Sequence, residues 1–452
     1  MPQACAKSLS QLGIRLEGSA YAPGDTIVGC VFRKSHIVTP GATVTISLFG
    51  RAKTKIVTRN ANNHTVTHRG RFTLVPRNGR PQTIFQGPLH IEVNQDEQAW
   101  PFAITLPRYV DPRHLEGEAQ DHSYLPVEAR DHELPPTYTL PSSGRTEGFV
   151  EYVLEAHLRT SRQGHCDYYE ARLPLSVINL DPNPPIADFG LIRSRNLRCI
   201  ASYRLVPGMG DAKLSFSQKM KQSLGTSSVP DIRFSLDVDV PTVIQLDNPT
   251  PIPFKLRAVP DWTRTSEVIQ DVPQNIKLVD VSLWLATQID IICAGTFYSH
   301  TKYKTQEFNL GVSTALRKAN RDMLIPCTSD APSIDIGEMI NLRVGPLSPG
   351  HTRLYPTFTT YNIKVTHRLR WSVTCQIADE RFEASGAVHL KLIPPSDERR
   401  RPDENPLPVG DEEIAAVEAR PSQQRSESWI RPPAEEEAPP SFAEAQKGKL
   451  KE

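Results

Sequence analysis

The residue types that carry catalysis or bind metals are scattered along this chain instead of standing at the spacings that such chemistry needs. His36, His157 and His165 show no metal-ligand spacing, and no two of the seven cysteines form a C-x-x-C pair. The zinc-protease, nucleophile-elbow and phosphate-loop patterns are also missing from the sequence. We therefore expect no enzyme activity, no catalytic residue, no bound metal and no cofactor.

The one short motif with a specific binding chemistry is Pro135-Pro136-Thr137-Tyr138. Adjacent prolines fix φ near the polyproline II value, so a short extended rod forms at little entropic cost. A tyrosine two residues after the pair matches the Pro-Pro-x-Tyr ligand that WW domains accept in aromatic-lined grooves. Pro135, Pro136 and Tyr138 are therefore predicted WW-binding residues. The alternative is that Tyr138 packs this segment onto a sheet.

The surroundings of this motif favour exposure. It lies in a long, acidic and proline-punctuated stretch, residues 107–148, and loops of this length usually run over the surface. A degenerate second motif, Pro439-Pro440-Ser441-Phe442, stands near the end of the sequence. Phe442 can fill the aromatic pocket but lacks the tyrosine hydroxyl, a loss of about 1 kcal/mol or roughly tenfold in affinity.

A cluster of arginines is the candidate contact for cargo or lipid. These side chains could meet phosphorylated peptides or acidic lipid headgroups, and the alternative is a solvated strand edge and hairpin. The cluster consists of Arg59, Arg69, Arg71, Arg77 and Arg80.

Composition limits the class of protein. The formal net charge is +1 over 452 residues, so no global field indicates nucleic-acid binding. The odd, dispersed cysteines suggest reduced thiols in the cytosol, and no apolar run is long enough to span a membrane. We expect a cytoplasmic protein with peripheral membrane contact at most.

Strict alternation of apolar and polar residues predicts an all-β fold, since successive side chains of a strand point to opposite faces. The alternating segments are 42–48, 150–158, 232–240 and 361–377, and Val153 alone breaks the pattern. Turn residues such as Pro23-Gly24-Asp25 separate these strands. Short helices are expected only at 219–224 and 315–323.

The strand spacing predicts two β-sandwich domains followed by a tail. The first domain spans 8–180 and contains the loop 107–148. A linker at 181–197 begins with Asp181-Pro182-Asn183-Pro184-Pro185 and leads to a second domain at 198–394. Residues 395–452 are rich in proline and charge, and we expect them to be disordered. Arg193, Arg195 and Arg198 are expected to join the two domains by ion pairs.

Several strands resemble those of the arrestin family. The nine residues 21–29, with Pro23-Gly24-Asp25 between two strands, resemble the signature at the start of the arrestin fold. Segments 44–51, 100–107 and 150–156 resemble later strands of the same domain, and 234–259 resembles the opening strands of the C-terminal arrestin domain. The likeness covers about residues 8–394 and is greatest to the α-arrestins of fungi.

This resemblance implies two tandem arrestin-like sandwiches in a cytosolic trafficking adaptor. Such an adaptor recruits a WW-domain HECT-type ubiquitin ligase to the cytosolic tails of membrane transporters or receptors at the plasma membrane or endosomes, and ubiquitination then promotes endocytosis. The alternative within the family is a protein-binding scaffold in vesicle sorting or signalling that recruits no ligase. A hydrolase or lectin-type sandwich is a third hypothesis, disfavoured by the missing motifs.

Overall fold

The computed structural model describes residues 12–59, 63–77, 81–92, 97–115, 123–140, 144–162, 165–210, 212–226, 228–295, 298–319, 323–346 and 353–400. Arg80, the motif at Pro439, Pro440 and Phe442, and the predicted tail beyond residue 400 lie outside this range.

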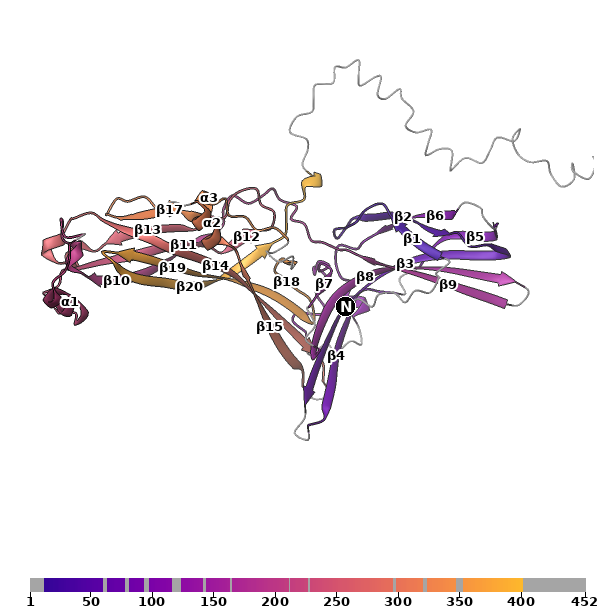
Figure 1. Cartoon of the computed structure of the whole chain (residues 1–452). Helices are drawn as coiled ribbons and strands as arrows, with labels where there is room; N and C mark the ends of the chain where they lie inside the picture. Colours follow the sequence, from indigo (N-terminus) through magenta and orange to yellow (C-terminus); the bar gives the residue numbers. More distant parts are fainter. Residues whose placement is uncertain are drawn as a thin grey trace, which may run out of the picture. The chain divides into compact units, whose positions relative to one another are not determined.

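The fold is all-β, as predicted (Figure 1). A three-stranded antiparallel sheet has the order β1-β2-β6 and contains β1 (Leu12–Leu16), β2 (Thr26–Arg33) and β6 (Gln98–Thr105). A six-stranded sheet has the order β4-β3-β8-β7, with β5 on β3 and β9 on β8. Its strands are β3 (Ile37–Arg59), β4 (Thr65–Val75), β5 (Gln82–Ile91), β7 (Tyr138–Thr139), β8 (Thr146–Arg162) and β9 (His165–Leu175).

The remaining strands form an eleven-stranded sheet of order β10-β11-β13-β16-β14-β19-β20-β12, with β15, β17 and β18 beside it. One residue pair, Ala258 with Cys327, connects β13 to β16 and so joins its two portions. The strands are β10 (Leu191–Ala201), β11 (Asp231–Pro241), β12 (Val243–Gln245), β13 (Lys255–Pro260), β14 (Gln274–Cys293), β15 (His300–Asn309), β16 (Met323–Cys327), β17 (Ile334–Asp335), β18 (Phe358–Thr359), β19 (Ile363–Ile377) and β20 (Glu380–Ile393).

Helices are few and short within the described residues. The α-helices are α1 (Phe216–Ser223), α2 (Val312–Ala319) and α3 (Ile336–Met339), and single 3-10 turns occur at Pro112–His114, Tyr203–Leu205, Trp262–Arg264, Glu267–Ile269 and Glu398–Arg400. The helices expected at 219–224 and 315–323 therefore exist but begin three residues earlier. None of the helices in the described part is long and apolar enough to cross a membrane.

The predicted alternation decides which side chains are buried. Every second residue of β19, from Ile363 to Ile377, is buried, and the residues between them are exposed or half-buried. One core cluster joins buried residues of the three-stranded and six-stranded sheets, for example Ile27 with Val44. A second cluster lies among the strands of the eleven-stranded sheet around Phe254 and Trp371.

The first core also contains residues from the predicted second domain. Ile289 and Ile291 of β14, and Ile363 and Val365 of β19, belong to it together with Cys293 and Tyr361. The described residues up to Asp397 belong to one compact unit, which contains both core clusters.

Buried hydrogen bonds join the same segments. The Thr54 hydroxyl on β3 donates to the Ile292 carbonyl (2.7 Å), and the Asn362 amide donates to the Thr54 oxygen (3.3 Å). In addition, the rings of His68 on β4 and His300 on β15 stack with centroids 3.5 Å apart. Both apolar and polar contacts therefore hold β14, β15 and β19 against β3 and β4.

Two expectations about the linker region are wrong. Strand β10 begins at Leu191, inside the expected linker 181–197, because its residues pair along their whole length with β11. Arg193 does not join two domains: it binds Asp239 (2.8 Å) on β11, the neighbouring strand. The Arg198 guanidinium donates to the Glu383 carbonyl of β20 in the same sheet.

A buried histidine on β19 predicts acid sensitivity. His367 is 2 % exposed, and burial lowers its pKa from 6.5 to about 4. Below pH 6.5 the unfolded chain binds a proton that the folded chain does not, so the free energy of unfolding should fall between pH 6.5 and 4, by on the order of 3 kcal/mol. Urea unfolding at a series of pH values measures this slope. The His367→Gln variant should show a shallower slope, and equal slopes in both proteins would refute the assignment.

Candidate functional site

The predicted docking segment is built into the first half of the fold. The Tyr152 hydroxyl on β8 donates to the Pro135 carbonyl (2.7 Å), and the Thr137 N–H donates to the Val177 carbonyl (2.9 Å). Thr137 also accepts a hydrogen bond from the Val177 N–H (2.9 Å). Tyr138 then pairs with Val150 as strand β7. These bonds fix the backbone of the segment against β8 and the chain after β9.

The Tyr138 side chain is a packing residue at the junction with the second half. Its ring is 3 % exposed and meets the rings of Tyr355 and Phe358 edge-on, with centroids 4.7 and 5.3 Å away. Burial raises the pKa of its hydroxyl well above the usual value. Aromatic pairs of this geometry add stability beyond the area that they bury.

The predicted exposure of the motif is therefore wrong. Pro135, Pro136 and Tyr138 are all buried, so a WW domain cannot reach the ring while the segment remains folded. The physical reason is that the aromatic partners of Tyr138 come from the second half of the chain, where the local sequence gives no sign of them.

Truncating Tyr138 should destabilise the fold. We expect Tyr138→Ala to lower the free energy of unfolding by about 3–5 kcal/mol, the usual cost of removing a buried aromatic ring. Tyr138→Phe keeps the ring, so it should cost less than about 1.5 kcal/mol. Urea unfolding of the three proteins measures both effects. An alanine variant as stable as the wild type would contradict the packing role.

A cationic face lies on the outer side of the same sheet. We use this name for Arg51, Lys53 and Lys55 of β3 with Arg69 and Arg71 of β4. Lys53 stands directly opposite Arg71 in the β3–β4 pairing, and Lys55 opposite Arg69. The alternate residues Ala52, Thr54 and Ile56 are buried, which turns the cations outward.

Carboxylates balance only part of this charge. On the other side of β3, Glu151 pairs with Arg51, and Glu147 pairs with Lys55 (3.1 Å). In the part of the chain that the structure describes, no ion pair of Lys53, Arg69 or Arg71 is seen. Among the described residues these three cations therefore form no close ion pair, although the charge of Glu151 acts on Lys53.

A cavity of about 350 Å³ opens beside Lys53. Arg51, Lys53, Phe149 and Glu151 contribute to its lining, as do Thr137 and Thr139 of the predicted docking segment. Burial and the charge of Arg51 lower the pKa of Lys53, and the charge of Glu151 opposes this shift only in part. The Lys53 ammonium lies 5.9 Å from the centre of the Phe149 ring. A bound carboxylate or phosphate would offset this repulsion, since charge-assisted hydrogen bonds favour anions.

The predicted arginine cluster is thus split by the structure. Arg69 and Arg71 belong to the cationic face, and Arg59 is exposed farther along the same side of β3. Arg77 does not belong to it, because its Nε and Nη2 donate to the two carboxylate oxygens of Glu155 on β8. Arg51, Lys53 and Lys55 were not among the predicted contact residues. Their strict alternation with Ala52, Thr54 and Ile56 indicates in the sequence that they share one face of a strand.

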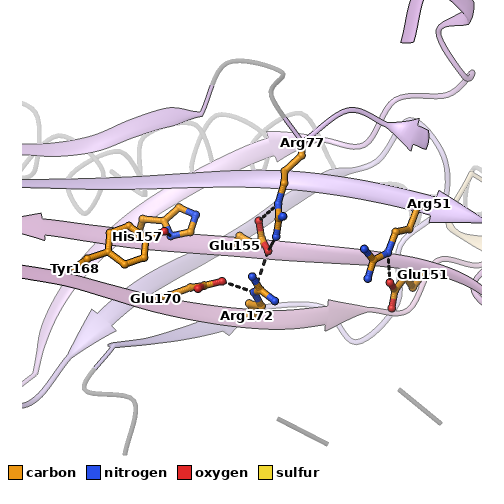
Figure 2. Close-up of polar contacts among 8 residues, drawn as sticks. All are labelled: Arg51, Arg77, Glu151, Glu155, His157, Tyr168, Glu170 and Arg172. Atoms are coloured by element: carbon orange, nitrogen blue, oxygen red, sulfur yellow. Dashed lines mark hydrogen bonds and ion pairs between the residues drawn. The ribbon is translucent and has the colours of Figure 1, made fainter. Parts of the chain in front are cut away.

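Glu155 is the buried centre of a charge network (Figure 2). Its side chain is 2 % exposed and bonds Arg77 through Nε (2.7 Å) and Arg172 through Nε (2.9 Å). Hydrogen bonding to Glu155 raises the pKa of Arg77. Arg172 also contacts Glu170, and beside this network the ring of Tyr168 stacks on His157, as Figure 2 shows. The arrangement is structural, because it leaves no carboxylate oxygen of Glu155 open to a ligand.

Neutralising the buried carboxylate should be costly. Glu155→Gln leaves Arg77 without its anion and Arg172 with Glu170 alone, and we expect a loss of about 1–3 kcal/mol in the free energy of unfolding. The matched control is Glu151→Gln, whose carboxylate is 24 % exposed and pairs with one arginine, and it should cost under about 1 kcal/mol. Thermal unfolding of both variants measures the two losses of stability. Equal losses in the two variants would argue against a buried network around Glu155.

Comparison of the sequence with protein-family models and with curated proteins gave no match.

Proposed function

We propose that this protein is an arrestin-like scaffold that binds acidic or phosphorylated segments of cytosolic protein tails, such as those of membrane transporters or receptors. The observation that carries the proposal is the cationic face, where Lys53, Arg69 and Arg71 form no ion pair among the described residues. The strand signatures that resemble the arrestin family, set in an all-β chain, support the same proposal.

The shape of the site fits a peptide in extended conformation. The cations lie on two neighbouring strands, and beside them is the cavity of about 350 Å³ that has Phe149 in its wall. A peptide with anionic side chains at alternate positions would meet the charges, and one apolar side chain would enter the cavity.

We do not propose that Pro135–Tyr138 recruits a ubiquitin ligase, since Pro135, Pro136 and Tyr138 are buried. In an adaptor of the ligase-recruiting type, the WW-binding role would pass to Pro439, Pro440 and Phe442, outside the described residues.

Peptide titrations test the cationic face. Fluorescein-labelled peptides rich in glutamate or phosphoserine are titrated with the full chain, and a neutral peptide of equal length serves as reference. We expect the Lys53→Gln/Arg69→Gln/Arg71→Gln variant to bind the acidic peptides about tenfold more weakly, because three exposed charge contacts contribute roughly 0.5 kcal/mol each.

A matched control removes the same charge elsewhere. The Lys302→Gln/Lys364→Gln/Arg368→Gln variant loses three positive charges from β15 and β19 and should bind like the wild type. Equal weakening in both variants would mean that the peptides respond to overall charge, and the proposed site would be wrong.

A WW-domain titration tests the assignment of the motif. The full chain and its Tyr138→Phe variant should bind a purified WW domain identically, because the ring is not accessible in either protein. Weaker binding by the variant would show that the segment opens and would restore Pro135–Tyr138 as a docking site.

A further inference from the structure

Helix α1 presents its apolar side chains to solvent. Phe216, Met220 and Leu224 are 79, 48 and 70 % exposed, and Leu224 is the C-cap residue. Residues four apart lie on one side of a helix, so these three form a continuous stripe. No residue of α1 is buried. A helix on a globular protein normally turns such a stripe toward the core, and here the orientation is reversed.

Polar contacts hold the helix in this orientation. Ser215 and Gln218 form a capping box at its start. On the side away from the stripe, the Gln222 amide donates to Glu380 (2.7 Å) and its oxygen accepts from the Tyr203 N–H (3.3 Å). The helix is therefore attached by its polar side, and the exposed stripe is part of the folded structure.

The charged residues within the segment 212–226 are all lysines. Lys213, Lys219 and Lys221 are exposed, and no acidic residue occurs from 212 to 226. Of the carboxylates at this end of the sheet, Asp379 pairs with Arg204, Glu380 accepts a hydrogen bond from Gln222 on the side away from the stripe, and Glu267 is exposed beside Val268.

The helix stands at one end of the second half, in the connection between β10 and β11 (Figure 1). The loop 261–270 lies at the same end, because the Ser266 hydroxyl donates to Asp231 at the start of β11 (2.6 Å). Val268 in this loop is 65 % exposed. The end of the sheet therefore carries a second apolar side chain in addition to the stripe of α1.

We propose that α1 binds an anionic lipid bilayer, with Phe216, Met220 and Leu224 in the headgroup boundary and Lys213, Lys219 and Lys221 on the phosphates. Exposed apolar side chains and flanking lysines are the combination that interfacial helices use. A second copy of the chain is a poor occupant, because it would bring two sets of lysines together. The proposal rests on α1 alone and does not depend on the cationic face.

Vesicle sedimentation tests this assignment. The full chain is mixed with vesicles of phosphatidylcholine alone or of phosphatidylcholine with phosphatidylserine, and the bound fraction is measured at low and high salt. We expect binding to the anionic vesicles only, weakened by salt. Phe216→Ser/Leu224→Ser should reduce binding at least tenfold, and Lys213→Gln/Lys219→Gln/Lys221→Gln should do the same.

Two controls keep the test specific. Leu197→Ser removes a side chain that is 79 % exposed on β10 and should leave vesicle binding unchanged. The Lys53→Gln/Arg69→Gln/Arg71→Gln variant should also bind vesicles normally, which separates this surface from the peptide site. The proposal is overturned if the wild type does not bind anionic vesicles, which is the result expected if α1 docks into a protein groove instead. It is also overturned if the α1 variants bind as the wild type does.

Discussion

The structure depends on the burial of apolar side chains from the end of β14 and the start of β19 in the first core. Ile289, Ile291, Ile363 and Val365 lie among residues of the first core cluster, and the hydroxyl of Thr54 on β3 donates to the Ile292 carbonyl of β14. These contacts remove apolar side chains of the second half from water, at roughly 25 cal/mol for each Å² buried. They make the described residues up to Asp397 one compact unit, although the sequence suggests two separate domains.

This junction explains why the most specific motif of the sequence is not a free ligand. Tyr138 occupies the place where the two halves meet, and its ring contacts Tyr355 and Phe358. The two surfaces that we propose for partners lie outside this junction. One is the outer side of β3 and β4, where cations alternate with buried residues, and the other is the end of the second half where α1 stands.

The all-β class and the principal strands could be predicted because alternation is a local property, as β19 illustrates. The burial of Tyr138 could not be predicted, because the Pro-Pro-x-Tyr spacing suits an exposed docking segment and a packed segment equally. Tyr355 and Phe358, the residues that bury Tyr138, lie more than 200 positions farther along the chain. The candidate site was predicted in part, since Arg69 and Arg71 were identified. Lys53 was not, because it joins them only through the pairing of β3 with β4, which places it opposite Arg71. Arg77 was misassigned because its partner Glu155 comes from a distant strand.

Hydrogen exchange measured at increasing urea concentration tests the shared core most directly. Amides of β3 and β8 report on the first core, and those of β11 and β20 report on the second. If β14 and β19 couple the two cores, both sets should lose protection at the same urea concentration, as cooperative units do. Loss of protection in β3 and β8 while β11 and β20 stay protected would show two independent domains and contradict the account.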